Sequence, residues 1–155
     1  MRALGVDHGR RRIGLALSDA SGTLARPWKT IPGQPASRPA ARAIAAELEA
    51  LERGDERVDV VVIGHPRRLS GEPNDQTVIV ERVAAALRTL VSVPVVLQDE
   101  RLSSHEADRL LAQHERDWRK RKALLDAMAA AVILQDYLDS GAARDVGAPV
   151  EDGER

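Results

Sequence analysis

Residues 2–18 read RALGVDHGRRRIGLALS, two short apolar runs on either side of a turn of glycine and arginine. Such runs are typical of β-strands, and the turn between them predicts that the two strands pair as a hairpin. Side chains alternate between the faces of a strand, so Asp7 shares a face with Ala3 and Gly5. An acid beside such small residues leaves room for a ligand.

A second acid follows another apolar run. Residues 93–98, VPVVLQ, are short and β-branched enough for a buried parallel strand, and Glu100 comes just after it. Open α/β sheets bind their ligands at the carboxyl ends of such strands. Ser103 and Glu106 form an S-x-x-E capping box, which predicts that a helix begins directly after this acidic turn.

A third acid lies in a helical pattern. Residues 124–138, LLDAMAAAVILQDYL, are apolar on nearly every face except at Asp126, which predicts a helix packed closely against a sheet. A carboxylate on that surface is costly unless a cation or hydrogen-bond donors compensate it. Each acid also has an ordinary structural explanation. Asp7 could cap the turn, Glu100 could pair with a basic neighbour, and Asp126 could interact with the positive end of a helix dipole.

With these acids in view, the chain resembles the YqgF/RuvX-type family, whose members are described as Holliday-junction resolvases or pre-16S rRNA nucleases with an RNase H-like fold. The resemblance implies that the active-site acids are Asp7, Glu100 and Asp126. His65 and the pair Arg67–Arg68 depart from the family pattern. Four ordered motifs carry the resemblance: GVDHG with RIGLA at 5–16, VIGHP with SG at 62–71, DERLSSHEA at 99–107, and DAMAA at 126–130.

The rest of the chain fits an α/β fold of this class. The expected order is βββαβαβαα, an RNase H-like mixed sheet with three antiparallel strands, then parallel crossovers, and helices on both faces. A loop rich in Gly and Pro precedes a helix that ends near Leu90. The other predicted elements are a third strand over 23–31, a helix over 36–53 and a fourth strand over 58–63.

At 155 residues the chain predicts one nuclease domain over residues 1–138, followed by an acidic tail over 139–155 that we expect to be disordered. The absence of cysteine excludes disulfides, thiolate metal sites and a cysteine nucleophile, and it is compatible with a cytoplasmic location. No apolar run is long enough for a signal or membrane span, so no membrane partner is expected.

Basic residues gather near the three acids. Although the net charge is -1, the tail holds 5 acids and 2 bases, which leaves 21 bases against 19 acids in residues 1–138. Such clusters suit contacts with nucleic-acid phosphates, although the stretch 116–122 is equally compatible with a solvated connection between helices. The candidate nucleic-acid-binding residues are Arg10, Arg11, Arg12, Arg67, Arg68, Arg101, Arg119, Arg121 and Lys122.

The resulting hypothesis is a metal-dependent nuclease that hydrolyses phosphodiester bonds. Asp7, Glu100 and Asp126 would bind one or two Mg²⁺ or Mn²⁺ ions, because oxygen ligands suit hard cations. Arg12 or Arg101 could neutralise charge on the phosphate. His8 is a candidate proton shuttle, and His105 a weaker one, because imidazole titrates near neutrality, but a lone turn histidine is more often a hydrogen-bonding bystander.

The sequence leaves the substrate open, since junction DNA, single-stranded nucleic acid and precursor rRNA carry the same phosphodiester. Resolving a Holliday junction would favour a homodimer that makes paired nicks, whereas trimming the 5′ end of pre-16S rRNA in ribosome biogenesis would not. Two alternatives are a catalytically weak protein that binds RNA or a ribosome-assembly partner, and a nucleotide-binding RNase H-like module. The second is disfavoured because ATP-binding relatives of this fold clasp ATP between two such domains.

Overall fold

The computed structural model describes residues 1–100 and 118–141, with side chains in the last helix described from residue 124 onward. The predicted order of strands and helices is confirmed over these residues, while the helix predicted to begin at the Ser103–Glu106 capping box lies outside them. The elements are β1 Ala3–His8, β2 Arg12–Ser18, β3 Ala25–Pro32, α1 Ser37–Arg53, β4 Val60–His65, α2 Asp75–Leu90, β5 Val95–Asp99 and α4 Trp118–Asp139.

The five strands form one mixed sheet in the order β3-β2-β1-β4-β5. Strands β1 to β3 are antiparallel neighbours, whereas β4 runs parallel to β1, and β5 runs parallel to β4. The carboxyl ends of β1, β4 and β5 therefore meet at one edge of the sheet. Asp7 lies at the end of β1, and Glu100 follows β5 directly, so the topology brings two of the predicted acids to this edge.

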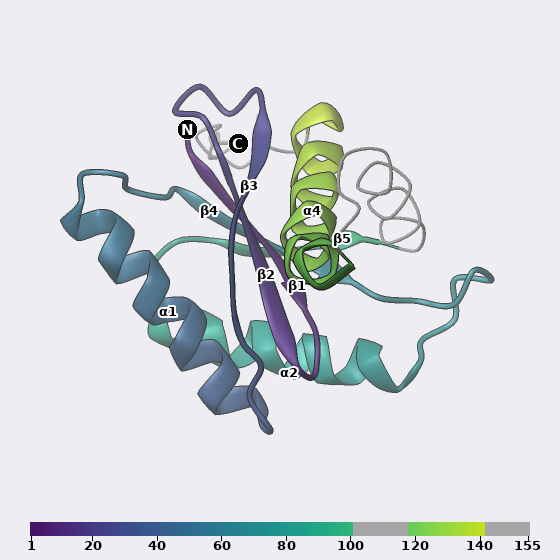
Figure 1. Ribbon diagram of the computed structural model, residues 1–155. Helices are drawn as coiled ribbons and strands as arrows, with labels where there is room; N and C mark the ends of the chain where they lie inside the picture. Colours follow the sequence, from purple (N-terminus) through teal and green to yellow (C-terminus); the bar gives the residue numbers. More distant parts are fainter. Residues whose placement is uncertain (101–117, 142–155) are drawn as a thin grey trace, which may run out of the picture.

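Helices cover both faces of the sheet, as the sequence predicted. In Figure 1, α1 and α2 lie together on one side, and α4 crosses the other side over β1 and β2. The alternation along β1 sorts its residues between these two layers. Leu4 packs into the core below α1 and α2, whereas Ala3 belongs to the core that α4 covers.

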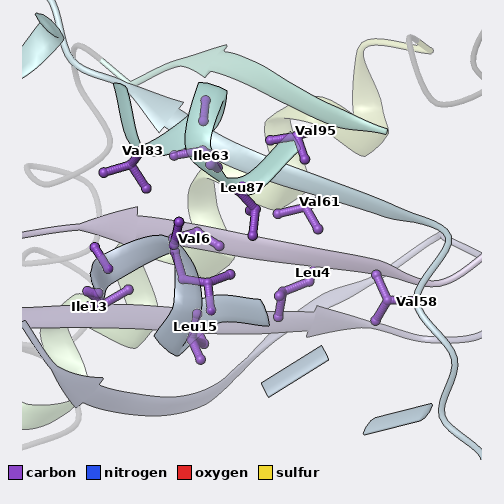
Figure 2. Packing of buried hydrophobic residues seen from close by; sticks show 14 of the residues in the cluster. Leu4, Val6, Ile13, Leu15, Val58, Val61, Ile63, Val83, Leu87 and Val95 are labelled. Atoms are coloured by element: carbon purple, nitrogen blue, oxygen red, sulfur yellow. The ribbon is translucent and has the colours of Figure 1, made fainter. Parts of the chain in front are cut away.

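The larger core is built from aliphatic side chains, since the chain has no phenylalanine. Figure 2 shows Leu4, Val6 and Leu15 from the hairpin against Leu87 of α2, and all four are fully buried. Burial of such side chains is worth about 1.5–3 kcal/mol each relative to exposure. This packing fixes the direction of β1 and thereby the position of the acid at its end.

The smaller core depends on a close approach of α4 to the hairpin. A Cβ atom on Gly5 would lie 2.8 Å from the carbonyl oxygen of Ala130, and one on Gly14 would lie 2.0 Å from the carbonyl oxygen of Asp126. Both distances are below ordinary contact, so only glycine fits beneath the helix. The alanines of α4 present a small-residue surface that completes this contact.

The Gly- and Pro-rich segment between β4 and α2 has a defined path. The amide of Arg68 donates to the carbonyl oxygen of Glu72 over 2.8 Å, and Gly71 adopts a positive φ of 89° that favours glycine. Asn74 then caps α2 by accepting from the amide of Thr77 over 3.0 Å. The loop therefore holds the two arginines Arg67 and Arg68 at the carboxyl end of β4.

The last helix is longer than the sequence-based expectation. Its described part, Trp118–Asp139, includes six residues before the predicted helix, and most of the predicted tail lies outside the described residues. Among the helices that the structure describes, none is both long and apolar enough to span a membrane.

Replacing Gly14 by alanine should destabilise the fold. The added methyl group would meet the backbone of α4 rather than a flexible side chain, so the helix has to move away from β2. We expect the free energy of unfolding, measured by urea denaturation, to fall by roughly 2–3 kcal/mol.

Gly54→Ala is the matched control, because a Cβ atom there would have no neighbour closer than 3.6 Å and the glycine has an ordinary φ of -90°. Its free energy of unfolding should stay within about 1 kcal/mol of the wild type. Equal stabilities for the two variants would contradict the tight contact between α4 and the hairpin.

Candidate active site

Asp7 is placed by the β1–β2 hairpin. It pairs across the hairpin with Gly14, and its carboxyl group lies on the face that α4 covers. Burial raises the pKa of Asp7 to about 6, the negative charge of Asp126 adds to the rise, and a hydrogen bond with Glu100 opposes it. A carboxyl group that loses water and faces another acid retains its proton more readily.

Glu100 reaches the same point from the end of β5. Its amide donates to the carbonyl oxygen of His65 over 3.4 Å, which turns the chain across the end of β4. Gly64 leaves the space for the carboxyl group, since a Cβ atom there would lie 2.5 Å from Oε2 of Glu100. Burial, the charge and hydrogen bond of Asp7, and the charge of Asp99 raise the pKa of Glu100 to about 8.

Asp7 and Glu100 thus form a carboxyl pair within hydrogen-bonding reach of each other. Ionising both groups at once places two negative charges side by side in a partly dehydrated site. In the metal-free protein the pair therefore keeps a proton at neutral pH, held mainly by Glu100, whose pKa is raised further. A cation at this position would favour the loss of that proton.

Asp126 joins the site from α4. Its Oδ2 accepts a hydrogen bond of 2.6 Å from Nε of Arg12, at the start of β2, and both side chains are partly buried. The structure places Arg12, which the sequence predicted as a phosphate contact, against this carboxylate. Arg12 therefore compensates the partly buried charge of Asp126, as the sequence analysis expected of a carboxylate on this helix surface.

The three predicted acids come from three separate elements and converge at one edge of the sheet. Their geometry differs from a preformed three-ligand site, because within residues 1–100 and 118–141 no set of three His, Asp or Glu side chains is arranged to hold one ion. Asp7 and Glu100 are adjacent, while Asp126 is drawn toward Arg12. Two oxygen donors are close together, and the third is engaged by a guanidinium.

The predicted basic residues are only partly covered by the structure. Arg10 and Arg11 are exposed in the turn between β1 and β2, and Arg67 and Arg68 are exposed in the loop after β4. These four arginines surround the edge of the sheet that carries the carboxylates. Arg101 lies outside the described residues, as do the side chains of Arg119, Arg121 and Lys122.

His8 is turned away from the carboxylates, since it follows Asp7 along β1 and faces α2. It is buried, and loss of hydration lowers the pKa of its imidazole. Its placement gives no support to the predicted proton-shuttle role. His105, a weaker candidate for the same role, lies outside the described residues.

Sequence reasoning missed two residues that shape this region. Gly64 was recognised only as part of a motif, although its lack of a side chain makes room for Glu100. Gln76, whose amide contacts His8, was not singled out. A glycine just before the end of a buried strand was a usable signal, whereas nothing in the local pattern around Gln76 pointed to a contact 68 residues away.

Residues 1–140 match the RuvX family, which is described as Holliday junction resolvase. The chain belongs to the RuvX family. It is 40% identical over 149 residues to a candidate pre-16S rRNA nuclease of Geobacillus thermodenitrificans, covering 90% of this chain and 99% of the relative. A relative from Chloroflexus aggregans with the same name is 42% identical over 137 residues, which cover 88% of this chain and 92% of the relative.

The fold likeness extends to a more distant protein of known structure. The RuvC protein of T. thermophilus, solved in complex with a Holliday junction substrate, superposes with a TM-score of 0.51 at 20% identity. The match covers 91% of this chain and 96% of that protein. At this level of identity the likeness shows the fold alone, and it confirms the predicted RNase H-like α/β architecture.

Replacing Glu100 by glutamine should stabilise the metal-free protein at alkaline pH. The folded protein holds the protons of Asp7 and Glu100 to higher pH than the unfolded chain does. The wild type should therefore lose stability as pH rises from about 4 through about 8, between the unfolded and folded pKa values. In Glu100→Gln most of this loss should vanish, a gain of about 2 kcal/mol or more near pH 9.

Urea denaturation in the presence of a chelator at several pH values measures this effect. Glu49→Gln is the control, because Glu49 is exposed on α1 and lies far from the carboxyl pair. A wild-type stability that rises between pH 5 and pH 9 by about 1 kcal/mol or more would contradict the buried-pair account.

Proposed function

We propose that this RuvX-family protein is a metal-dependent nuclease with Asp7, Glu100 and Asp126 as its catalytic carboxylates. The observation that carries the proposal is the pair formed by Asp7 and Glu100 at the carboxyl edge of the sheet, where both pKa values are raised by burial. Such a pair costs stability, and perturbed acids of this kind cluster at functional sites.

The donor set fits a hard divalent cation. Carboxylate oxygens are preferred ligands of Mg²⁺ and Mn²⁺, and a cation would relieve the repulsion between Asp7 and Glu100. When bound, such an ion supplies Lewis-acid chemistry for a phosphodiester. Asp126 could contribute the carboxylate oxygen that does not contact Arg12, or both oxygens once the ion pair with Arg12 opens.

The residues around the acids have separable roles in this proposal. Arg12 positions Asp126 and limits the net negative charge that an approaching phosphate meets. Arg67 and Arg68 lie exposed beside the site and would hold the nucleic-acid backbone. The β1–β2 turn closes through a hydrogen bond of 3.0 Å from the amide of Gly9 to the carbonyl oxygen of Arg12. A Cβ atom on Gly9 would lie 2.6 Å from that same carbonyl oxygen, so the tight turn itself requires glycine.

For the substrate we propose pre-16S rRNA, trimmed at its 5′ end in the cytoplasm during ribosome biogenesis. The support is the name of relatives that are about 40% identical over nearly their whole length. Holliday junction DNA is the second candidate, because the family description names it, and it would require a homodimer that makes paired nicks.

Asp7→Asn should abolish cleavage without loss of folding or of most nucleic-acid binding. The change removes a charged oxygen ligand and preserves the shape of the side chain, so cleavage should fall by about 10³-fold or more. The assay supplies Mg²⁺ or Mn²⁺ with precursor 16S rRNA, four-way DNA junctions and single strands, and resolves products at single nucleotides. Asp55→Asn is the control, since Asp55 is exposed after α1, and its φ of 60° suits asparagine.

The substrate that is cut decides between the two candidates. Cleavage that persists in Asp7→Asn would contradict the carboxylate assignment. If the wild type binds RNA tightly but cuts no substrate with either metal, the nuclease proposal fails in favour of a binding protein in ribosome assembly.

Replacing Arg67 and Arg68 by glutamine should weaken binding and flatten its dependence on salt. Each lost phosphate contact lowers the slope of log K against log salt by about 0.7–0.9. Fluorescence anisotropy with a labelled strand at several salt concentrations measures the slope. Arg26→Gln is the control, because Arg26 pairs with Leu17 at the opposite edge of the sheet. An unchanged slope in the double variant would exclude the two arginines from the interface.

A further inference from the structure

A cavity of about 520 Å³ opens on the side of the sheet opposite to the carboxylates. Its walls come from the end of β1, the turn between β1 and β2, the start of α1, and α2. In Figure 1 the first turn of α1 and the β1–β2 turn both lie at the lower end of the ribbon, next to α2. We call it the α1 cavity; its lining includes His8, Arg10, Ala36, Ser37, Ile79 and Arg82.

His8 lines this cavity, and its Nε2 atom is buried beside it. The side chain is only 7% exposed. The amide nitrogen of Gln76 lies 3.3 Å from Nδ1 of His8 and 3.2 Å from its carbonyl oxygen, so it donates to both. The ring proton of the neutral imidazole therefore sits on Nε2, which has no hydrogen-bond partner among the described residues.

The start of α1 adds further donors. The first intrahelical hydrogen bond runs from the amide of Ala40 to the carbonyl oxygen of Ala36 over 3.2 Å, so the amides of Ser37 and Arg38 precede it. No side chain in the part of the chain that the structure describes caps the helix, and its first turn carries no acid. It carries Arg38 instead, a positive charge where the helix dipole favours a negative one. A bound anion would satisfy both the amides and the charges.

Two arginines complete the set of positive groups. Arg10 reaches the cavity from the β1–β2 turn and Arg82 from α2, and among the described residues no acidic side chain lines the cavity. A guanidinium is always charged and presents several donors in a plane, which matches the oxygens of a phosphate. Two guanidinium groups and the first amides of α1 together are donors for one multivalent oxyanion, with the buried imidazole N–H of His8 beside them.

We propose that the α1 cavity binds a phosphate group, supplied by the backbone or the end of a nucleic-acid strand. His8 directly follows Asp7 in β1, and the two side chains point to opposite faces, so the cavity and the carboxylates share one edge of the sheet. A strand that crosses this edge would place one phosphate in the cavity and another at the carboxylates. The claim that the cavity binds a phosphate group rests on the cavity alone. The claim that a nucleic-acid strand supplies this group rests on the proposed nuclease function.

Phosphate titration of the ¹⁵N-labelled full-length chain tests this proposal. With no divalent metal present, inorganic phosphate should move the Nε2–H signal of His8 and the amide signal of Ser37. The double variant Arg10→Gln with Arg82→Gln should bind phosphate about tenfold more weakly, because it loses two charge-assisted donors. Both arginines are exposed, so neither change disturbs the core.

Arg53→Gln is the charge-matched control, since Arg53 lies in the last turn of α1, far from the cavity, and its phosphate affinity should equal that of the wild type. No movement of the two signals at saturating phosphate would overturn the proposal. Equal affinity in the double variant and the control would overturn it as well.

Oligonucleotides with and without a terminal phosphate distinguish the sources of the group. If both kinds of oligonucleotide move the NMR signals of His8 and Ser37, the cavity binds a phosphate of the strand backbone. If only the phosphorylated kind moves them, the cavity binds the phosphate at the strand end. Movement with inorganic phosphate alone would overturn the strand as the source. These readouts require no cleavage, so they fail or succeed independently of the nuclease assay.

Discussion

The close contact between helix α4 and the β1–β2 hairpin determines the geometry of the site. The carbonyl oxygen of Asp126 stands 2.0 Å from where a Cβ atom of Gly14 would be, and Gly14 pairs directly with Asp7. The absence of a side chain at Gly14 therefore determines how close Asp126 comes to Asp7. Gly5 plays the same role one turn farther along α4, where Ala130 and Leu134 lie over the strand.

This contact has an electrostatic consequence. Three carboxyl groups meet in a partly buried region, yet within residues 1–100 and 118–141 only Asp126 has a guanidinium against it, supplied by Arg12 over 2.6 Å. The pair formed by Asp7 and Glu100 is left to share a proton, and its burial lowers the stability of the folded protein above neutral pH. Proteins retain a destabilising group of this kind where a bound ligand removes the loss of stability. This is the physical basis of the metal-binding proposal.

Much of this arrangement could be predicted from local patterns. The alternation along residues 2–8 placed Asp7 on the same face as Gly5, and the apolar run before Glu100 marked a strand whose end lies at the shared edge of the sheet. Both inferences use periodicity and topology, which the sequence carries directly.

The remaining features depend on contacts between distant residues. The ion pair between Arg12 and Asp126 joins residues 114 positions apart, and no local pattern distinguishes it from a phosphate contact. The part of α4 before residue 124 was missed because its basic residues, which are good helix formers, break the apolar pattern. The cavity beside His8 likewise needs α1, α2 and the hairpin to be folded together.

A crystal structure of the protein grown with Mn²⁺, with the metal located by its anomalous scattering, tests most directly whether Asp7 and Glu100 hold a cation. We expect a peak about 2.1 Å from carboxylate oxygens of both residues. A well-diffracting crystal with no metal between these two residues, or with Mn²⁺ bound only elsewhere, would contradict the claim that this buried pair is held for a cation.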